Sequence, residues 1–183
     1  MKKHTVLVPL DGSEFSQQVL SSIQDFLNPA ADQIILFHVA AEAYGLIPDP
    51  PLPAVNEWRE PAYKTHRDAR LAKHPIYANQ IRDSLAATVE GELQPVKHRL
   101  EAAGFTVSVV VKFGEPAQEI LEFVEAEPVD LIAMTTHGRT GFSRLIMGSV
   151  AEKVLHKVSL PVLLLHPTKQ EAPTTDYSIK ARA

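Results

Sequence analysis

Five short apolar runs, separated by stretches with helical periodicity, dominate the hydrophobic pattern of the chain. The runs are Val6–Leu10, Ile34–Val39, Val107–Val111, Leu131–Met134 and Val162–Leu165. They are rich in β-branched residues and hardly alternate with polar ones, which is typical of strands buried on both faces of a parallel sheet. The pattern therefore predicts five strands of one buried sheet.

The first two helical patterns differ in length. Apolar residues from Phe15 to Leu27 fall on one helical stripe, and Ser13 is a candidate N-cap for it. A longer stripe runs from Ile81 to Leu100 and ends at Gly104, a good C-terminal stop. Pro95 lies inside this stripe, where it removes an amide donor, so we expect a kink there rather than a break.

Two shorter helices are predicted in the second half. Pro116 suits the first turn of a helix that ends near Pro128. The spacing of Ser149 and Glu152 fits a capping box, with Ser149 as the N-cap of the last helix. Strands that alternate with helices in this way indicate a doubly wound α/β fold, a five-stranded parallel sheet with helices on both faces.

The length of 183 residues favours a single domain, which we expect over residues 1–166. A Pro-rich segment at about 40–75 is much longer than the usual connection in such folds and predicts a surface excursion or lid. Residues 167–183 are polar with almost no apolar anchor, so we expect a disordered tail.

Charge and composition narrow the possible partners. The net charge is −4 and cysteine is absent, which excludes disulfides, iron–sulfur clusters and thiol nucleophiles. No basic field attracts nucleic acid, and no apolar run reaches the roughly 20 residues of a membrane span. The N-terminus shows no signal-peptide pattern, so we expect a cytoplasmic protein.

Candidate chemistry lies after the first and fourth predicted strands. In open α/β sheets, ligands bind beyond the carboxyl ends of the strands. The first strand is followed by Asp11, Gly12 and Ser13. The fourth is followed by a stretch, residues 134–149, in which glycines allow close backbone approach, hydroxyls and arginines are present, and a helix begins at the end. Such a stretch suits an anion.

Two common nucleotide fingerprints are absent. The stretch lacks the lysine of a P-loop, and no G-x-G occurs anywhere in the chain. P-loop hydrolases and dinucleotide-dependent dehydrogenases are therefore disfavoured.

Several collinear motifs instead resemble the universal stress protein (UspA-like) superfamily. They are VLVPLDGSE, ILFHV, GEPAQEIL, THGRTGFSRLIMGSVAEKVL and PVLLL, and together they extend from Thr5 to Leu165. The ATP-binding branch of this family carries the signature G-x2-G-x9-G-[ST]. Gly138, nine intervening residues and then Gly148-Ser149 match it, but Thr135 stands at the first glycine position.

The resemblance implies a Rossmann-like fold of the adenine nucleotide alpha hydrolase type that binds ATP, ADP or AMP. The positions that it assigns to the nucleotide are Pro9, Asp11, Val39, Met134, Thr135, Gly138, Arg139, Gly148, Ser149 and Val150. Asp11 and the backbone of Val39 would lie near adenine and ribose, and the glycines with Ser149 would hold the phosphates. Mg²⁺ or Mn²⁺ would come with a triphosphate rather than sit in a protein cage.

The resemblance also implies a homodimer formed through the last strand. Its residues are Val162, Leu163, Leu164 and Leu165. This apolar strand is expected on an edge of the sheet, and exposed apolar edges are either covered or paired. No sequence feature identifies a regulatory protein partner.

Simpler interpretations of individual residues remain open. Asp11 has a second possible role as a helix cap, and His137 is best interpreted as a loop histidine bonded to nearby backbone. His38 lies in an apolar strand and is expected to be a packed, hydrogen-bonded residue rather than a metal ligand. The basic segment Trp58–His74 is expected to be a solvated amphipathic face, and a phosphate or partner contact is its alternative.

Three functions are compatible with the sequence. The first is a nucleotide-binding regulatory protein that acts through occupancy and dimerisation. The second is a ligand-free dimerisation module in which Thr135 has closed the pocket. The third is at most a slow ATP hydrolase, since no general base or nucleophile pair stands beside the glycines.

Overall fold

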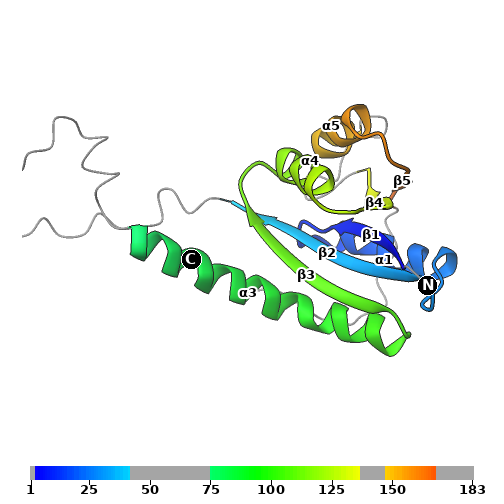
Figure 1. The fold of residues 1–183 in the computed structure, drawn as a ribbon, viewed down its shortest axis with the longest axis horizontal. Coiled ribbons are helices and arrows are strands. Elements are labelled where there is room, and N and C mark those ends of the chain that lie inside the picture. The colour runs from blue at the N-terminus through cyan, green and yellow to red at the C-terminus, as the bar shows by residue number, and fades with distance from the viewer. Residues whose placement is uncertain (1–2, 42–74, 137–146, 168–183) are drawn as a thin grey trace, which may run out of the picture.

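The fold is built on a five-stranded parallel sheet (Figure 1). The computed structural model describes residues 3–41, 75–136 and 147–167. The strands are β1 (His4–Pro9), β2 (Asp32–Ala40), β3 (Thr106–Phe113), β4 (Leu131–Thr135) and β5 (Val162–Leu165). Their order is β3-β2-β1-β4-β5, and every neighbouring pair is parallel. Four of the predicted apolar runs lie entirely within strands, and the first, Val6–Leu10, extends one residue beyond the end of β1 at Pro9.

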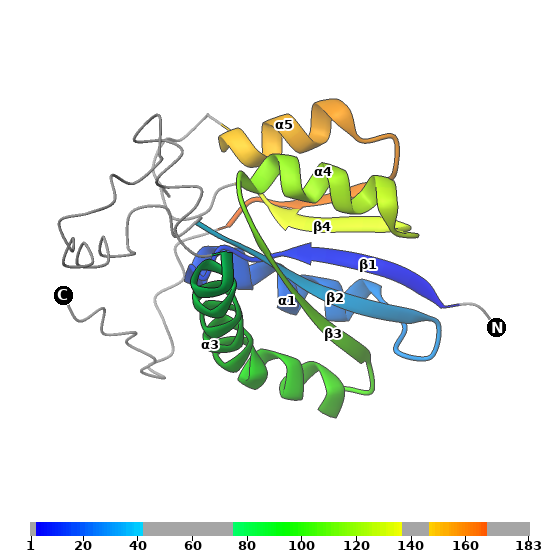
Figure 2. The ribbon, with the colours of Figure 1, turned by 60° about the vertical axis from the view of Figure 1, so that its left-hand side comes forward.

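Helices cover both faces of this sheet. The described helices are α1 (Glu14–Phe26), α3 (Pro75–Ala102), α4 (Pro116–Ala126) and α5 (Ser149–Lys157). Figure 2 shows α1 and α3 below the sheet and α4 and α5 above it. This arrangement confirms the predicted doubly wound α/β fold. No helix of the described residues is long and apolar enough to cross a membrane.

Two apolar cores lie on opposite faces of the sheet because successive strand residues point to opposite sides. Val8, Leu36 and Ala133 belong to the core beneath α1 and α3. Their neighbours Phe37 and Ile132 belong to the core beneath α4 and α5. The strands therefore need apolar residues at consecutive positions, which explains the runs without alternation.

The N-termini of two helices, α1 and α4, agree with the local sequence pattern. Ser13 caps α1, and its hydroxyl oxygen accepts a hydrogen bond from the amide of Ser16 at 3.1 Å. Pro116 occupies the first turn of α4, next to Glu115, which is the N-cap. Both observations confirm predictions made from the local sequence.

Pro95 lies inside a continuous helix. The helix α3 extends through Pro95 to Ala102, so a break at this position is excluded. Proline removes the hydrogen bond to the carbonyl four residues earlier and crowds it. That residue is Gly91, which is exposed and has open space around it, so solvent can satisfy the carbonyl.

The predicted capping role of Ser149 is wrong. The N-cap of α5 is Gly148, which has no side chain that could bond the first amides of this helix. Ser149 already belongs to the helix as its first residue, so it does not occupy the non-helical position from which a hydroxyl caps. The predicted start of the helix at Ser149 is correct.

Several predicted features lie outside the described residues. They include most of the expected insertion at about 40–75, the segment 137–146 and most of the expected tail at 167–183. These expectations stay predictions.

Candidate functional site

The strand order of the sheet reverses between β1 and β4. From β1 the chain proceeds to β2 and β3 on one side, and it then crosses to β4 and β5 on the other. Ligands of open α/β sheets bind at such a point, outside the carboxyl ends of the strands. The ladder between β1 and β4 covers two pairs only, Val6 with Leu131 and Leu7 with Ile132. The carboxyl ends of the two strands are therefore not joined by ladder pairs.

Three of the predicted site residues share one face at this edge. Met134 is buried in the core beneath α4 and α5, and Val39 packs against the same core. Pro9 is paired with Phe37, another member of that core, so it points the same way. Together they line the carboxyl edge of β1, β2 and β4 with apolar surface, which suits one face of a flat aromatic base.

Asp11 lies in a tight loop between β1 and α1. Its Oδ1 accepts hydrogen bonds from the backbone amide of Ser13 at 2.9 Å and from the Ser13 hydroxyl at 2.6 Å. Gly12 between them has a φ of 81°, a conformation that favours glycine. Since Ser13 is the N-cap, Asp11 does not cap α1 itself. It braces the capping serine, and its carboxylate is held in place while half-buried.

The start of α5 is tied to the end of β4. The amide of Gly148 donates to the carbonyl of Thr136 at 2.7 Å, and the amide of Thr136 donates to the carbonyl of Leu165 at 2.8 Å. Gly148 and Ser149 are therefore brought to the same edge as Met134, although they lie far along the chain. In Figure 2, α5 begins on the side toward which the strands point. The first turn of a helix carries partial positive charge, which favours an anion.

Val150 follows in the first turn of α5. It is half-buried and packs against the core beneath α4 and α5, which anchors the beginning of this helix. Gly138 and Arg139, which were also predicted for the site, lie outside the described residues. So does His137.

Thr135 points away from the apolar lining. It is the last residue of β4 and only 7% exposed. Ala133, two residues earlier, belongs to the core beneath α1 and α3, so alternation places the Thr135 side chain on that same face. Met134 lies on the opposite face. The methyl and hydroxyl groups of Thr135 are thus directed away from the surface formed by Pro9, Val39 and Met134.

His38 is half-buried and hydrogen-bonded. Its Nδ1 lies 2.8 Å from the carbonyl oxygen of Leu10. The prediction of a hydrogen-bonded strand histidine is confirmed. Within the part of the chain that the structure describes, no group of three or more His, Cys, Asp or Glu side chains is placed to hold a metal ion.

One polar contact at this edge was missed by the sequence analysis. The Oγ1 atom of Thr136 lies 3.1 Å from Nδ1 of His166, just beyond the ends of β4 and β5. Both residues are polar and directly follow apolar strands, which is the signal that would have found them. The pair marks the outer border of the same edge.

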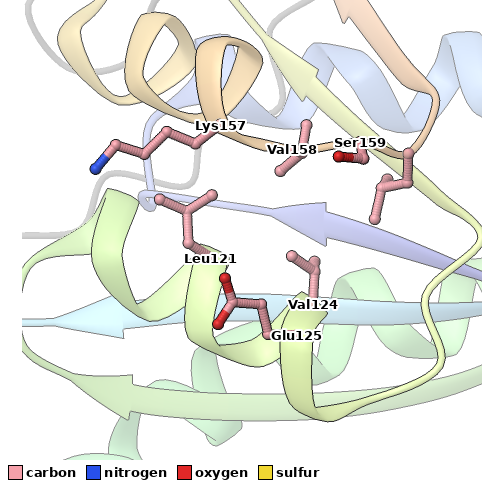
Figure 3. Close-up of a pocket in the computed structure, with 7 residues that line it drawn as sticks. Leu121, Val124, Glu125, Lys157, Val158 and Ser159 are labelled. Carbon is pink, nitrogen blue, oxygen red and sulfur yellow. The ribbon is translucent and has the colours of Figure 1, made fainter.

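A separate cavity lies on the α4/α5 side of the molecule (Figure 3). Its volume is about 310 Å³. The residues that line it are Leu121, Val124, Glu125, Lys157, Val158, Ser159 and Leu160. They belong to the later part of α4, the last residue of α5 and the connection from α5 to β5, and the cavity contains none of the predicted site residues.

Comparison with known proteins identifies relatives over nearly the whole chain. The family model described as "Universal stress protein family" matches residues 3–166. Universal stress protein MJ0577 of Methanocaldococcus jannaschii is 28% identical over 166 residues, covering 87% of this chain and 93% of that protein. Its solved structure superposes with a TM-score of 0.67 at 25% identity, over 93% of this chain and 100% of the other.

Two further solved relatives have a similar fold. One is a universal stress protein in complex with cAMP, with a TM-score of 0.56 and 16% identity over 91% of this chain and 98% of its own. The other is an Arabidopsis thaliana universal stress protein family protein with AMP bound, with a TM-score of 0.54 and 15% identity over 93% and 96%. The match to the family model spans all five strands, and the chain therefore belongs to the universal stress protein family.

Proposed function

We propose that this chain is a stress-response regulatory protein that binds an adenine nucleotide and acts through nucleotide occupancy and dimerisation. The observation that carries the proposal is the convergence at one sheet edge of residues far apart in sequence: the apolar lining, the braced Asp11 and the start of α5. The relatives solved with cAMP and with AMP support an adenine nucleotide as the class of ligand.

Each part of the edge suits one part of the nucleotide. Pro9, Val39 and Met134 offer apolar surface to adenine. The carboxylate of Asp11 is a hydrogen-bond acceptor for the ribose hydroxyls. The amides at the start of α5, where the N-cap Gly148 has no side chain, are donors for phosphate oxygens. Gly138 and Arg139 complete the expected phosphate contacts.

A divalent cation would accompany a triphosphate. Mg²⁺ and Mn²⁺ prefer phosphate oxygens and water, and the hydroxyl of Ser149 at the exposed start of α5 is a compatible oxygen ligand. The role of the cation would be to neutralise phosphate charge. The chain's own residues orient the nucleotide.

Calorimetric titration with ATP and Mg²⁺ tests the proposal. We expect binding heat for the native chain and its loss in Gly148→Arg, because the arginine side chain would occupy the phosphate position. Gly148 has a φ of −63°, so any residue fits its backbone and the variant should fold. The matched control is Gly91→Arg on the exposed face of α3, where an added side chain meets nothing. A native chain that gives no heat and no thermal shift with ATP would refute the proposal.

The dimer is proposed through β5. This strand lies at the edge of the sheet, and all four of its residues are only half-buried. Light scattering at micromolar concentration should give twice the monomer mass, and Leu163→Glu should lower it. Leu155→Glu, at a 41% exposed position of α5, serves as the control. A native chain that scatters as a monomer would refute this part.

The second candidate, a dimerisation module without a nucleotide, rests on the identity of one residue, Thr135. It replaces the first glycine of the family signature with a larger residue. Two results would favour this candidate: a purified chain that releases no nucleotide on denaturation, and a melting temperature that ATP does not change.

A further inference from the structure

The imidazole of His38 is fixed against the backbone of the neighbouring strand. Its Nδ1 is 2.8 Å from the carbonyl oxygen of Leu10. A carbonyl oxygen only accepts hydrogen bonds, so Nδ1 must carry the hydrogen and donate it. His38 shares the face of β2 that carries Ile34 and Leu36, on the side of α1 and α3.

This bond completes a clamp on the residue that follows β1. The amide of Leu10 donates to the carbonyl of Phe37 at 2.8 Å, and the carbonyl of Leu10 accepts from His38. Both backbone polar groups of Leu10 are thus held by consecutive residues of β2. Leu10 itself is 3% exposed, so its carbonyl depends on a protein donor rather than on bulk water.

The clamp fixes the peptide that leads into Asp11. Downstream of Asp11 the chain is anchored by the two hydrogen bonds to Ser13 and by the cap of α1. Upstream the only peptide group between the sheet and Asp11 is that of Leu10. Without the His38 donor this peptide could rotate, and the direction of the Asp11 side chain would change with it.

We propose that His38 is a positioning residue for the nucleoside end of the ligand: by donating to the Leu10 carbonyl it holds Asp11 in the orientation that receives the ribose. The proposal rests on the proposed function. It separates two halves of the proposed site, because the phosphate half is built on the hydrogen bond from Gly148 to Thr136 at the start of α5, whereas His38 bonds the carbonyl of Leu10 after β1.

The experiment compares three probes by calorimetry: adenosine, MgATP and inorganic tripolyphosphate. In His38→Leu, adenosine and MgATP should each bind about tenfold more weakly, since one buried acceptor loses its donor. Tripolyphosphate binding should not change. His38→Asn should restore binding to within about threefold, because its Nδ2 lies as many bonds from Cα as Nδ1 and also donates. His98→Leu, at an exposed position of α3, is the matched control.

Each outcome decides the role. If His38→Leu binds adenosine as the native chain does, the positioning role is wrong. If it loses affinity for all three probes equally and Asn does not rescue it, His38 contributes to general stability only. Selective loss with rescue by Asn supports the proposal.

A second measurement needs no nucleotide. The amide of Ser13 donates to Asp11, so its hydrogen exchange reports whether the loop is ordered. Exchange should be faster in His38→Leu than in the native chain and unchanged in His98→Leu. Equal exchange in all three chains would overturn the clamp. If the native chain bound none of the three probes while the exchange difference was present, the proposed function would fail and the clamp would remain a feature of the loop alone.

Discussion

Replacement of Thr135 by glycine restores the family signature and tests whether this residue obstructs the nucleotide. Thr135 ends β4, pairs with Leu165 and is 7% exposed. Its side chain lies on the α1/α3 face, whereas Pro9, Val39 and Met134 line the other face. We therefore expect Thr135→Gly to reduce stability and to leave the affinity for MgATP almost unchanged.

The loss of stability follows from three contributions. Removing the buried methyl group costs about 0.8 kcal/mol, and losing the buried hydroxyl's interaction costs about 1 kcal/mol. Glycine in a strand adds about 0.5–1 kcal/mol through backbone entropy. The sum is roughly 2–3 kcal/mol, which corresponds to a drop of about 5–10 °C in the melting temperature of a chain of this size.

Urea unfolding and calorimetric titration with MgATP measure the two expectations on the same samples. Ala133→Gly is the matched control, because Ala133 lies in the same strand, on the same face and fully buried. Both variants should bind MgATP within about threefold of the native chain, a difference of less than about 0.7 kcal/mol. A gain of about tenfold in Thr135→Gly alone would refute the argument from alternation, and binding by Thr135→Gly when the native chain does not bind would show that threonine closes the site.

Three other predictions concern the helix ends. The amide of Gln118 donates to Glu115 and lowers the pKa of that carboxyl below its ordinary 4.5. The stabilisation that comes with the carboxylate charge is therefore present above pH 4.5 and is lost as the pH falls through the lowered pKa. Glu115→Ala should cost about 0.5–1 kcal/mol in urea unfolding at pH 7 and less at a pH below the lowered pKa. Gly104 has a φ of 94°, so Gly104→Ala should lower the free energy of unfolding, measured with urea, by about 1–2 kcal/mol. An unchanged urea midpoint would contradict the left-handed geometry. Ser13→Ala should cost about 1 kcal/mol through the lost cap of α1 and should also weaken adenosine binding in calorimetry, because Asp11 loses the hydroxyl that braces it.

The sheet was predictable because strands that are buried on both faces require a recognisable hydrophobic pattern in the sequence. A strand covered on both faces needs apolar residues at consecutive positions, and the run Leu131–Met134 contains members of both cores. The order of the strands cannot be derived from any single apolar run, since it depends on which helices cover which face of the sheet. The sequence analysis predicted only that Val162–Leu165 lies on an edge of the sheet, and the order of the other strands came from the structure.

The error at Ser149 shows the limit of local patterns. A capping box specifies residue types at a spacing of three, but it does not specify which residue first adopts helical dihedral angles. Here the hydrogen bond from Gly148 to Thr136 fixes Gly148 in an extended conformation and starts the helix at the next residue. That bond joins residues 12 positions apart through the fold, so no short window contains it.

The sequence analysis named candidate site residues but could not give their geometry. Asp11, Gly148 and Ser149 were named from the motifs that resemble the family, and the structure brings their loops to one edge. The contact between Thr136 and His166 could not be predicted in the same way, because it requires β4 and β5 to be neighbours. The role of His38 also needed the register that places it beside Leu10.

The alternation of side chains across the sheet explains how a departure from the signature and an intact site can coexist. Residues at the carboxyl edge divide into two groups: Met134 and Val39 face α4 and α5, and Thr135 and His38 face α1 and α3. The first group would contact the ligand, whereas the second shapes the backbone from behind. A side chain added in the second group changes stability and loop order before it changes the binding surface. Substitutions there should therefore alter affinity only through the backbone that they hold, which is why His38 is expected to affect binding and Thr135 is not.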